Sequence, residues 1–295
     1  MTSIVVPKLI IHGGAGSTPD SKGTEAWRSL HRIVAAVYGQ LEAGCAATAA
    51  VLMACTQLED DPCFNAGTGS VLQSDGQIRM SASLMEGTRQ CFSGVINVSR
   101  VKNPILMAQA LQCQGDRVLS DHGAAELARE LGLPLYNPLT ESRLQEWLQD
   151  RQNSTSPKRM AEVTMGTIGA VALDREGRIC AGTSTGGRGF ERIGRVSDSA
   201  TPAGNYANAI AGISCTGVGE DILDEGLATR IVVRVTDGLS LQEAIARSMD
   251  EGLSRQRDFG VIGVAVDGAI AWGKTTSVLF AAYHNGEQSF DTHDA

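Results

Sequence analysis

A buried strand is predicted at residues 167–173, which read Thr167-Ile168-Gly169-Ala170-Val171-Ala172-Leu173 and follow Gly166. The apolar run is continuous, as in a strand that is covered on both faces. Residues 151–166 before it are polar up to Met165, contain Pro157 and show no apolar period, so they predict an exposed linker. A turn at 174–177 leads to a partner strand at 179–185. Because strands and helices alternate on both sides of the linker, we expect helices packed outside stacked sheets.

Thr167 follows a linker that proteases could reach and a small residue, Gly166. If the bond between them were cut, Thr167 would carry a free α-amine beside its own hydroxyl. An α-amine has a pKa of about 7.7–8, against roughly 10.4 for lysine, so it can act as a base at neutral pH. A threonine hydroxyl needs such a neighbour to become a nucleophile. From this feature alone, an ordinary strand start after a loop is the better interpretation.

Other residues around the two strands favour chemistry. Thr185 ends the partner strand, so its hydroxyl is expected near Thr167. Thr216 and Gly217 lie where a strand gives way to a helix, and the free N–H groups at such a junction suit a developing oxyanion.

Arg195 and Asp198 present opposite charges three residues apart in an irregular stretch. Such a pair fits the head group of an amino acid, with the guanidinium on the carboxylate and the carboxylate on the ammonium. The alternative is a surface salt bridge, which is common and contributes little stability.

Composition limits the class of protein. Of 295 residues, 25 are basic and 33 acidic, and this net charge of −8 makes nucleic acid an improbable partner. The 34 glycines are about 12% of the 295 residues, against a usual share of about 7%, and they predict many turns inside a folded body. No apolar run reaches membrane-spanning length. Residues 1–11 are interrupted by Pro7 and Lys8, so we expect a strand there rather than a signal peptide, and a cytoplasmic protein.

Several chemistries find little support. The seven cysteines form no CxxC pair and the five histidines no HExxH, which argues against a disulfide framework and a zinc site. Residues 14–19 and 217–222 lack the third glycine of a dinucleotide loop, so tight turns are the better interpretation. Residues 182–186 match GxSxG, but the following glycines start a helix poorly, and only His284 and His293 come later.

The remaining elements follow from periodicity and turn residues. Before the linker we expect a strand at 8–11, helices at 27–41 and 46–58, a hairpin of 70–73 and 78–84 around Asp75-Gly76, a strand at 92–98, and helices from Pro104 to Leu111, at 124–131 and at 143–148. After it we expect a strand at 209–215 and one helix that is opened by 216–220 and contains Ile222, Leu223, Leu227 and Ile231. A helix capped by Ser240 and Glu243 and a meander of 261–266, 270–273 and 278–283 complete the chain.

At these residues the sequence resembles the plant-type asparaginase/isoaspartyl peptidase family of N-terminal nucleophile hydrolases. Six segments in family order carry the resemblance: His12-Gly13-Gly14-Ala15-Gly16, Phe64-Asn65-Ala66-Gly67-Thr68-Gly69, Gly166-Thr167-Ile168-Gly169-Ala170-Val171-Ala172, Thr183-Ser184-Thr185-Gly186-Gly187, Gly194-Arg195-Val196-Ser197-Asp198-Ser199, and Ser214-Cys215-Thr216-Gly217-Val218-Gly219-Glu220.

The resemblance implies an α+β fold, a four-layer αββα sandwich that forms a single domain over residues 1–295. It implies a precursor that cuts itself between Gly166 and Thr167. The resulting α chain (1–166) and β chain (167–295) would stay together and dimerise to (αβ)2.

The resemblance also implies roles for single residues. Thr167 is similar to the nucleophile and Thr185 to the hydroxyl that supports it. Two further pairs are implied: Thr216 and Gly217 as the oxyanion hole, Arg195 and Asp198 as the clamp on the substrate's α-carboxylate and α-amine. Gly219 would line the substrate pocket, and Asn65 would face it from the α chain. Backbone carbonyls in the loop from Leu58 to Phe64, including that of Glu59, would hold a structural sodium ion; the turn His12-Gly13-Gly14 would support self-cleavage.

The expected function is hydrolysis of β-aspartyl amide bonds in β-aspartyl dipeptides or L-asparagine, with no cofactor in catalysis and no membrane partner. Glycosylasparaginase and a taspase-like threonine protease are alternatives with the same nucleophile, and an inactive binding scaffold is a more distant one. The linker is short for the family, and Ser81 and Glu86 stand where aspartates are usual.

Overall fold

The computed structural model describes residues 5–16, 21–152 and 166–293. Its strands are β1 (Lys8–Gly16), β2 (Met80–Glu86), β3 (Cys91–Val98), β4 (Val118–Ser120), β5 (Ile168–Leu173), β6 (Ile179–Thr185), β7 (Asn205–Ala207), β8 (Ala211–Gly217), β9 (Phe259–Ala265), β10 (Ile270–Lys274), β11 (Val278–His284) and β12 (Ser289–Asp291). Its helices are α1 (Ser21–Glu42), α2 (Ala47–Asp60), α3 (Pro104–Ala110), α4 (Asp121–Glu130), α5 (Glu141–Gln152), α6 (Gly219–Glu225), α7 (Leu227–Thr236) and α8 (Leu241–Ser254), with 3-10 turns η1 (Leu111–Cys113) and η3 (Asp198–Ala200).

The larger sheet has eight strands in the order β12-β11-β1-β5-β6-β2-β3-β4. Its neighbours are antiparallel except for β3 and β4. Every residue of β5 and β6 is buried, as the continuous apolar run of β5 predicted. The hairpin that these strands form therefore lies in the middle of the sheet rather than at its edge.

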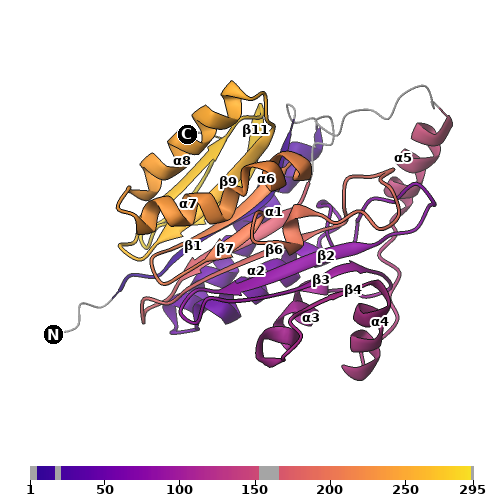
Figure 1. Cartoon of the computed structure of the whole chain (residues 1–295), viewed down its shortest axis with the longest axis horizontal. Helices are drawn as coiled ribbons and strands as arrows, with labels where there is room; N and C mark the ends of the chain where they lie inside the picture. Colours follow the sequence, from indigo (N-terminus) through magenta and orange to yellow (C-terminus); the bar gives the residue numbers. More distant parts are fainter. Residues whose placement is uncertain (1–4, 17–20, 153–165, 294–295) are drawn as a thin grey trace.

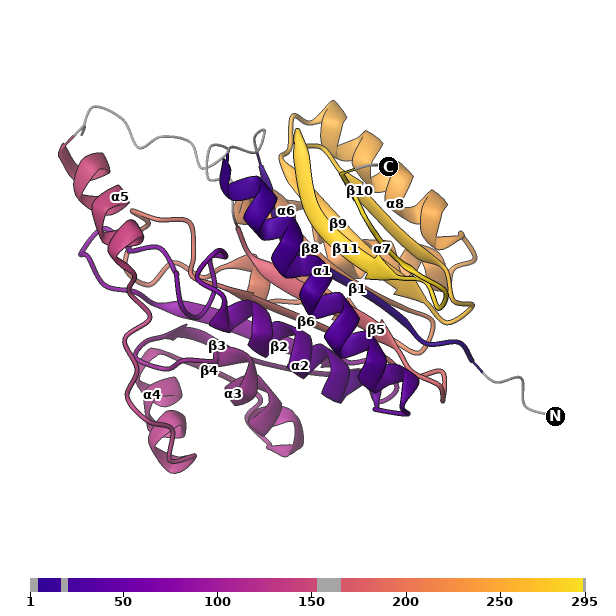
Figure 2. The same cartoon turned by 180° about the vertical axis from the view of Figure 1, so that it is seen from behind.

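A second sheet of four strands, β10-β9-β8-β7, packs against the larger one. Ile10, Val171, Ile179 and Ile262 belong to the buried cluster between the two sheets. Helices α1, α2 and α3 pack on the far side of the larger sheet and α7 and α8 on the far side of the smaller one, as Figures 1 and 2 show. The expected mixed α/β architecture, with helices outside stacked sheets, is thus present.

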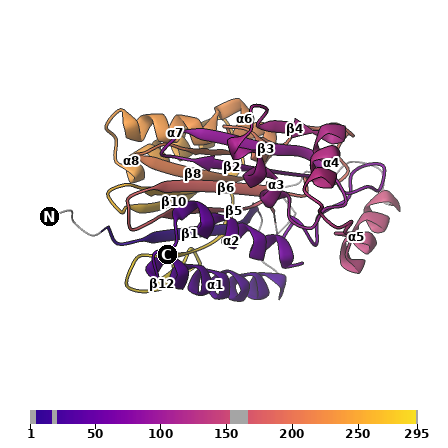
Figure 3. The same cartoon turned by 90° about the horizontal axis from the view of Figure 1, so that it is seen from below.

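The first helix illustrates why its sequence folds as it does. Leu30, Val34, Val37 and Leu41 recur at helical spacing and are all buried in α1, which lies along the larger sheet in the view of Figure 3. In the described part of the chain, no helix is long and apolar enough to cross a membrane.

Three predictions about secondary structure were wrong. Residues 70–79 form a loop rather than the first strand of a hairpin, and β2 begins only at Met80. The single helix expected from 216 onwards is two helices, because Gly226 adopts φ +52° between α6 and α7. The C-terminal meander is split, since β9 and β10 pair in the smaller sheet while β11 pairs with β1 in the larger one.

The strand expected at 8–11 is longer and passes through the glycine-rich segment to Gly16. Its register against β11 shifts between His12 and Gly14, and Gly14 takes φ +136°, where a side chain would strain the backbone. This extension brings Ala15 and Gly16 beside the start of β5. The linker expected at 151–166 falls largely outside the described residues, although Arg151 belongs to α5.

Candidate active site

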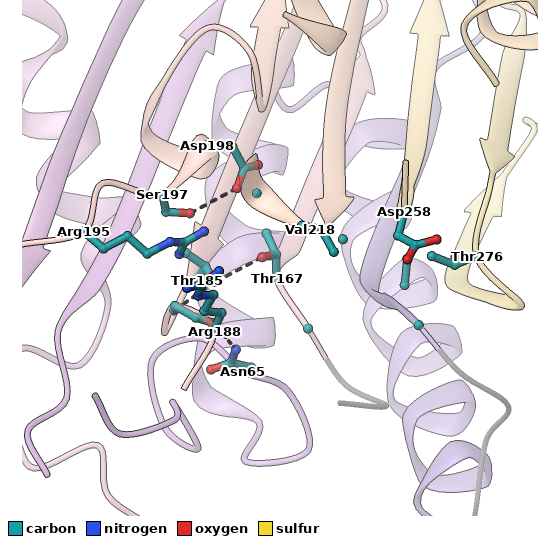
Figure 4. A pocket seen from close by; sticks show the side chains of 16 residues that line it. Asn65, Thr167, Thr185, Arg188, Arg195, Ser197, Asp198, Val218, Asp258 and Thr276 are labelled. Carbon is teal, nitrogen blue, oxygen red and sulfur yellow. Dashed lines mark hydrogen bonds between the residues drawn. The ribbon is translucent and has the colours of Figure 1, made fainter. Parts of the chain in front are cut away.

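Thr167 lies immediately before β5, at the edge of a pocket that Figure 4 shows from close by. Its side chain is buried, and its Oγ1 donates a hydrogen bond to Thr185 Oγ1 at 3.0 Å. The antiparallel pairing of β5 with β6 explains this contact. Ile168 is opposite Ser184, so Thr167, which precedes Ile168, faces Thr185, which follows Ser184. Thr185 Oγ1 also accepts the Gly187 N–H at 3.2 Å, which orients its hydroxyl. The expected approach of the two hydroxyls is therefore present.

Two backbone hydrogen bonds of Gly166 hold the chain at its junction with Thr167. Gly166 N–H donates to Gly13 O, and Asn65 N–H donates to Gly166 O, both at 3.3 Å. A donor on this carbonyl would stabilise the negative charge that develops there if the bond were attacked. The Asn65 side chain itself binds the loops around it, through Gly187 O at 2.7 Å and Val71 N–H at 3.0 Å. It is the backbone of Asn65 that contacts the junction.

The buried His12 side chain is held next to the junction by hydrogen bonds at both of its ring nitrogens. Its Nδ1 lies 3.0 Å from Thr167 O, which can only accept, and its Nε2 lies 2.8 Å from Ser214 Oγ. Burial lowers the pKa of His12 from 6.5 to about 3, against the opposing effect of the bond to Thr167. His12 is therefore neutral, donates from Nδ1 and accepts from Ser214 at Nε2. It holds Thr167 in place but is too weak a base to accept the hydroxyl proton.

Thr216 is the penultimate residue of β8, just before the chain leaves the sheet. Its Oγ1 is buried and has no hydrogen-bond partner among the described residues. A Cβ on Gly166 would stand 3.5 Å from this oxygen, so the hydroxyl faces the junction. A buried hydroxyl without a hydrogen-bond partner destabilises the fold unless a ligand supplies that partner. Helix α6 starts at Gly219, two residues beyond Gly217, rather than directly at the expected oxyanion pair.

Arg195 forms ion pairs that the sequence did not suggest. Its Nε and Nη2 donate to Glu220 at 2.9 and 3.1 Å, and its Nη1 donates to Glu191 at 3.1 Å. A guanidinium has five N–H donors, and three are occupied here. One N–H on each terminal nitrogen has no acceptor among the described residues and can donate to a carboxylate of the substrate. The alternative interpretation, a salt bridge between Arg195 and Asp198, is not among the ion pairs of the described residues, where Arg195 pairs with Glu191 and Glu220 instead.

Asp198 is a buried carboxyl group in the same pocket. Its Oδ1 accepts a hydrogen bond from Ser197 at 3.2 Å, while its Oδ2 has no partner in the part of the chain that the structure describes. Burial raises the pKa of Asp198 from 3.8 to about 6, although the nearby positive charge of Arg195 opposes the shift. A Cβ at Gly204 would lie 2.6 Å from Oδ2, so that oxygen faces the protein interior, whereas Oδ1 faces the space beside Gly219, where a cationic partner from outside the chain can reach it.

Gly219 separates the two charged groups. A Cβ at this position would lie 2.6 Å from Arg195 Nη2 and 2.7 Å from Asp198 Oδ1. Those distances are far below van der Waals contact, so any side chain would displace the guanidinium or fill the space between the two groups. Glycine at 219 thus keeps open a gap with a positive wall and an acidic wall.

The pocket also contains residues that the sequence did not single out. Arg188, Ser197, Val218, Asp258 and Thr276 line it together with the predicted residues. In Figure 4, Arg195 and Asp198 lie on one side of Thr167, while Asp258 and Thr276 lie beyond Val218 on the other. Their positions depend on how β8 and β9 meet the larger sheet, and no local pattern indicates that.

The departures at Ser81 and Glu86 lie along β2 and outside the residues that line the pocket. Ser81 Oγ accepts the Asn97 N–H at 3.2 Å. The Glu86 carboxylate accepts the N–H groups of Thr88 and Arg89, both at 3.0 Å. Both side chains therefore support the strand and its turn.

The expected sodium loop begins in a helix. Leu58 and Glu59 belong to the last turn of α2, where Leu58 O accepts Asp61 N–H at 3.4 Å and Glu59 O accepts Thr68 N–H at 2.7 Å. Each oxygen keeps one lone pair. Phe64 O would lie 2.9 Å from a Cβ at Gly69, so this carbonyl lines a space that only glycine leaves open. The oxygen-only donor set suits a hard cation.

Comparison with known proteins gives one consistent picture. A family model described as "Asparaginase" matches residues 5–293. The "Isoaspartyl peptidase/L-asparaginase" of Nostoc sp. is 60% identical, over 99% of this chain and 96% of that protein, and the protein of the same name from Synechocystis sp. is 60% identical over 98% and 91%. The "Plant-type L-asparaginase" of Pyrococcus horikoshii is 37% identical over 93% of this chain and 95% of its own length.

Proposed function

The chain belongs to the asparaginase family, and on that basis we propose that it hydrolyses β-aspartyl amide bonds in β-aspartyl dipeptides and L-asparagine. The observation that carries the proposal is the placement of the Thr167 hydroxyl, 3.0 Å from Thr185, in one pocket with Arg195 and Asp198. A nucleophile beside a carboxylate-binding and an ammonium-binding group fits an amino acid whose side chain carries the reacting amide.

We propose that the chain first cuts itself. Thr167 Oγ1 would attack the Gly166 carbonyl, whose oxygen accepts the Asn65 N–H. The C–N bond would then break, with the hydroxyl proton passing to the nitrogen, to give an ester and the free α-amine. Water would hydrolyse the ester and release the Gly166 carboxylate and the Thr167 hydroxyl. Residues 1–166 and 167–295 would remain one domain, because β5 is paired with β1 and β6 in the middle of the larger sheet. We assign its layers to the αββα sandwich of N-terminal nucleophile hydrolases and propose an (αβ)2 assembly.

In the mature enzyme we propose that the Thr167 α-amine accepts the proton of its own hydroxyl as Oγ1 attacks the substrate's side-chain carbonyl. Thr216 Oγ1 and the Gly217 N–H would donate to the oxyanion, which gives the orphaned Thr216 hydroxyl a partner. Ammonia or an amino acid leaves with the proton from the α-amine. Water then attacks the ester and releases L-aspartate.

A substrate panel tests this function against its rivals. Purified protein should release L-aspartate from β-aspartyl dipeptides and from L-asparagine, and the smaller fragment should begin with Thr167. Turnover of glycosylasparagine alone would favour a glycosylasparaginase, and cutting of protein substrates alone a taspase-like protease. An intact band of 31.0 kDa after long incubation, with no product, would favour an inactive scaffold.

The raised pKa of Asp198 predicts an acid limb in substrate affinity. The carboxyl must be ionised to bind an ammonium, so KM for L-asparagine should rise as the pH falls through about 6 and should be level above about 7. Because the folded pKa is raised, the same protonation stabilises the fold between about pH 6 and 4 and does not unfold it. Steady-state kinetics from pH 5 to 8 measure the limb. Asp198→Asn should raise KM above about pH 6, where the wild-type carboxyl is ionised, and so flatten the profile; an unchanged acid limb in this variant would contradict the assignment.

We propose that the carbonyls of Leu58, Glu59 and Phe64 would hold a sodium ion that stiffens the segment between α2 and β2 and takes no part in the reaction. Replacing NaCl by choline chloride at equal ionic strength should lower Tm by about 2–4 °C, the shift expected for about 1 kcal/mol in a chain of this size. Differential scanning calorimetry measures it. Equal Tm in the two salts would remove the sodium site from the proposal.

A further inference from the structure

Glu191 is a buried acidic residue for which the reaction scheme has no use. Its side chain is 3% exposed, and its Oε2 accepts hydrogen bonds from Arg195 Nη1 at 3.1 Å and from the Arg188 N–H at 2.8 Å. Glu220, the other partner of Arg195, is 45% exposed and is therefore well solvated. Of the two carboxylates on Arg195, the one on Glu191 is the better constrained.

Gln73 fixes the other oxygen of Glu191. Gln73 Nε2 donates to Glu191 Oε1 at 2.9 Å. The orientation of this amide is set, because Gln73 Oε1 accepts from Arg79 Nη1 at 2.6 Å. The backbone of Gln73 is held as well, since Trp147 Nε1 donates to its carbonyl at 3.0 Å. A chain of hydrogen bonds thus runs from Arg79 through Gln73 and Glu191 to Arg195.

The segment that carries Glu191 is docked independently of this side chain. Phe190 N–H donates to Leu72 O at 3.0 Å, Ser74 N–H donates to Glu191 O at 3.2 Å, and the Phe190 ring stacks on Trp147 at 5.7 Å between centroids. The loop would therefore stay in place if the Glu191 carboxylate were altered. What would change is the direction of the Arg195 guanidinium.

We propose that Glu191 is the positioning residue of Arg195, and that Gln73 sets Glu191 from the part of the chain that precedes the cleavage site. The relay leaves one N–H on each terminal nitrogen of Arg195 for the substrate's α-carboxylate. The inference rests on the proposed function and adds a specificity-determining contact between residues 1–166 and residues 167–295.

Glu191→Gln is a sharp test because an amide cannot replace this carboxylate. The two oxygens of Glu191 accept three donors, from Gln73, Arg188 and Arg195. A glutamine has one acceptor oxygen, so its NH2 group must face a donor in either orientation. KM for a β-aspartyl dipeptide should rise about tenfold while kcat stays within about twofold and cleavage before Thr167 is complete. Gln73→Met, which removes the donor to Glu191 and the acceptor for Arg79 but leaves the Glu191 carboxylate in place, should raise KM by a smaller factor.

Two comparisons separate positioning from loss of stability. Glu225→Gln is the matched control, because Glu225 is an equally buried partner of Arg230 and Arg255 outside the pocket, and it should leave KM unchanged even if Tm falls. In an Arg195→Ala background, Glu191→Gln should have no further effect on KM, since it acts through Arg195. Calorimetric titration with L-aspartate should reproduce the KM change without turnover.

The possible results distinguish failure of the inference about Glu191 from failure of the proposed function. An unchanged or lower KM in Glu191→Gln, or an equal rise in the Arg195→Ala background, overturns the inference while wild-type turnover upholds the proposed function. A wild-type protein that hydrolyses no β-aspartyl compound and binds no L-aspartate overturns the function itself.

Discussion

Thr167→Ala is expected to leave the chain uncut and to lower β-aspartyl hydrolysis by at least about 10⁴-fold, because one hydroxyl serves both reactions. Alanine keeps the strand start and the backbone bonds that involve Gly166, Asn65 and His12. The fold should therefore survive, with the loss confined to the hydroxyl that contacts Thr185. A denaturing gel and intact-mass measurement report the junction, and release of L-aspartate from a dipeptide reports turnover.

Thr167→Ser is the matched control for this prediction. Serine keeps an Oγ but lacks the methyl group that limits rotation about χ1, so cleavage should proceed more slowly and some turnover should remain. A Thr167→Ala protein that still hydrolyses dipeptides, or wild-type protein that is active with the Gly166–Thr167 bond whole, would refute the nucleophile.

Arg195→Ala is expected to lower kcat/KM for β-aspartyl dipeptides by about 10²–10³-fold, mostly through KM, while self-cleavage continues. Truncating one partner of a buried charge pair costs about 2–5 kcal/mol, and the substrate's α-carboxylate would lose both open N–H donors. The proposed cleavage would use the Gly166 carbonyl and Thr167, which do not contact the guanidinium among the described hydrogen bonds. Steady-state kinetics and a gel of the same preparation measure the two effects.

Stability has to be followed in the same variant, because Arg195→Ala leaves Glu191 buried without its cationic partner. Arg195→Lys keeps the charge and most of the stability but cannot form the two parallel hydrogen bonds, so KM should still rise. If both variants unfold and neither changes KM in the folded fraction, Arg195 is a structural ion pair rather than a substrate-binding residue.

Local sequence patterns predicted the central hairpin well. The apolar run after Gly166, the turn at 174–177 and the strand ending at Thr185 are adjacent in sequence, so the approach of two hydroxyls follows from one register. The capping box of Ser240 and Glu243 is likewise present at the start of α8, because it needs only four consecutive residues. Both of these predictions depended only on residues that are neighbours along the chain.

Predictions that needed a distant partner were less accurate. Residues 70–79 have a turn sequence, yet they form a loop that Trp147 and Glu191 hold by contacts to its backbone. The strand β11 has the pattern of a meander strand but pairs with β1, some 270 residues earlier along the chain. Alternation of apolar residues indicates that a strand has a buried face, but it does not indicate which other strand it pairs with.

By itself, the sequence determined a central glycine-bounded strand with a threonine at its start, the motif residues around it and membership of a family. Tertiary structure alone decided that Arg195 Nη2 lies beside Gly219 while its Nη1 donates to Glu191, that His12 is neutral, and that the Thr216 hydroxyl has no partner among the described residues. The physical reason is that charge state and side-chain direction depend on burial and on groups from other elements. Those groups are brought together only when the two sheets pack.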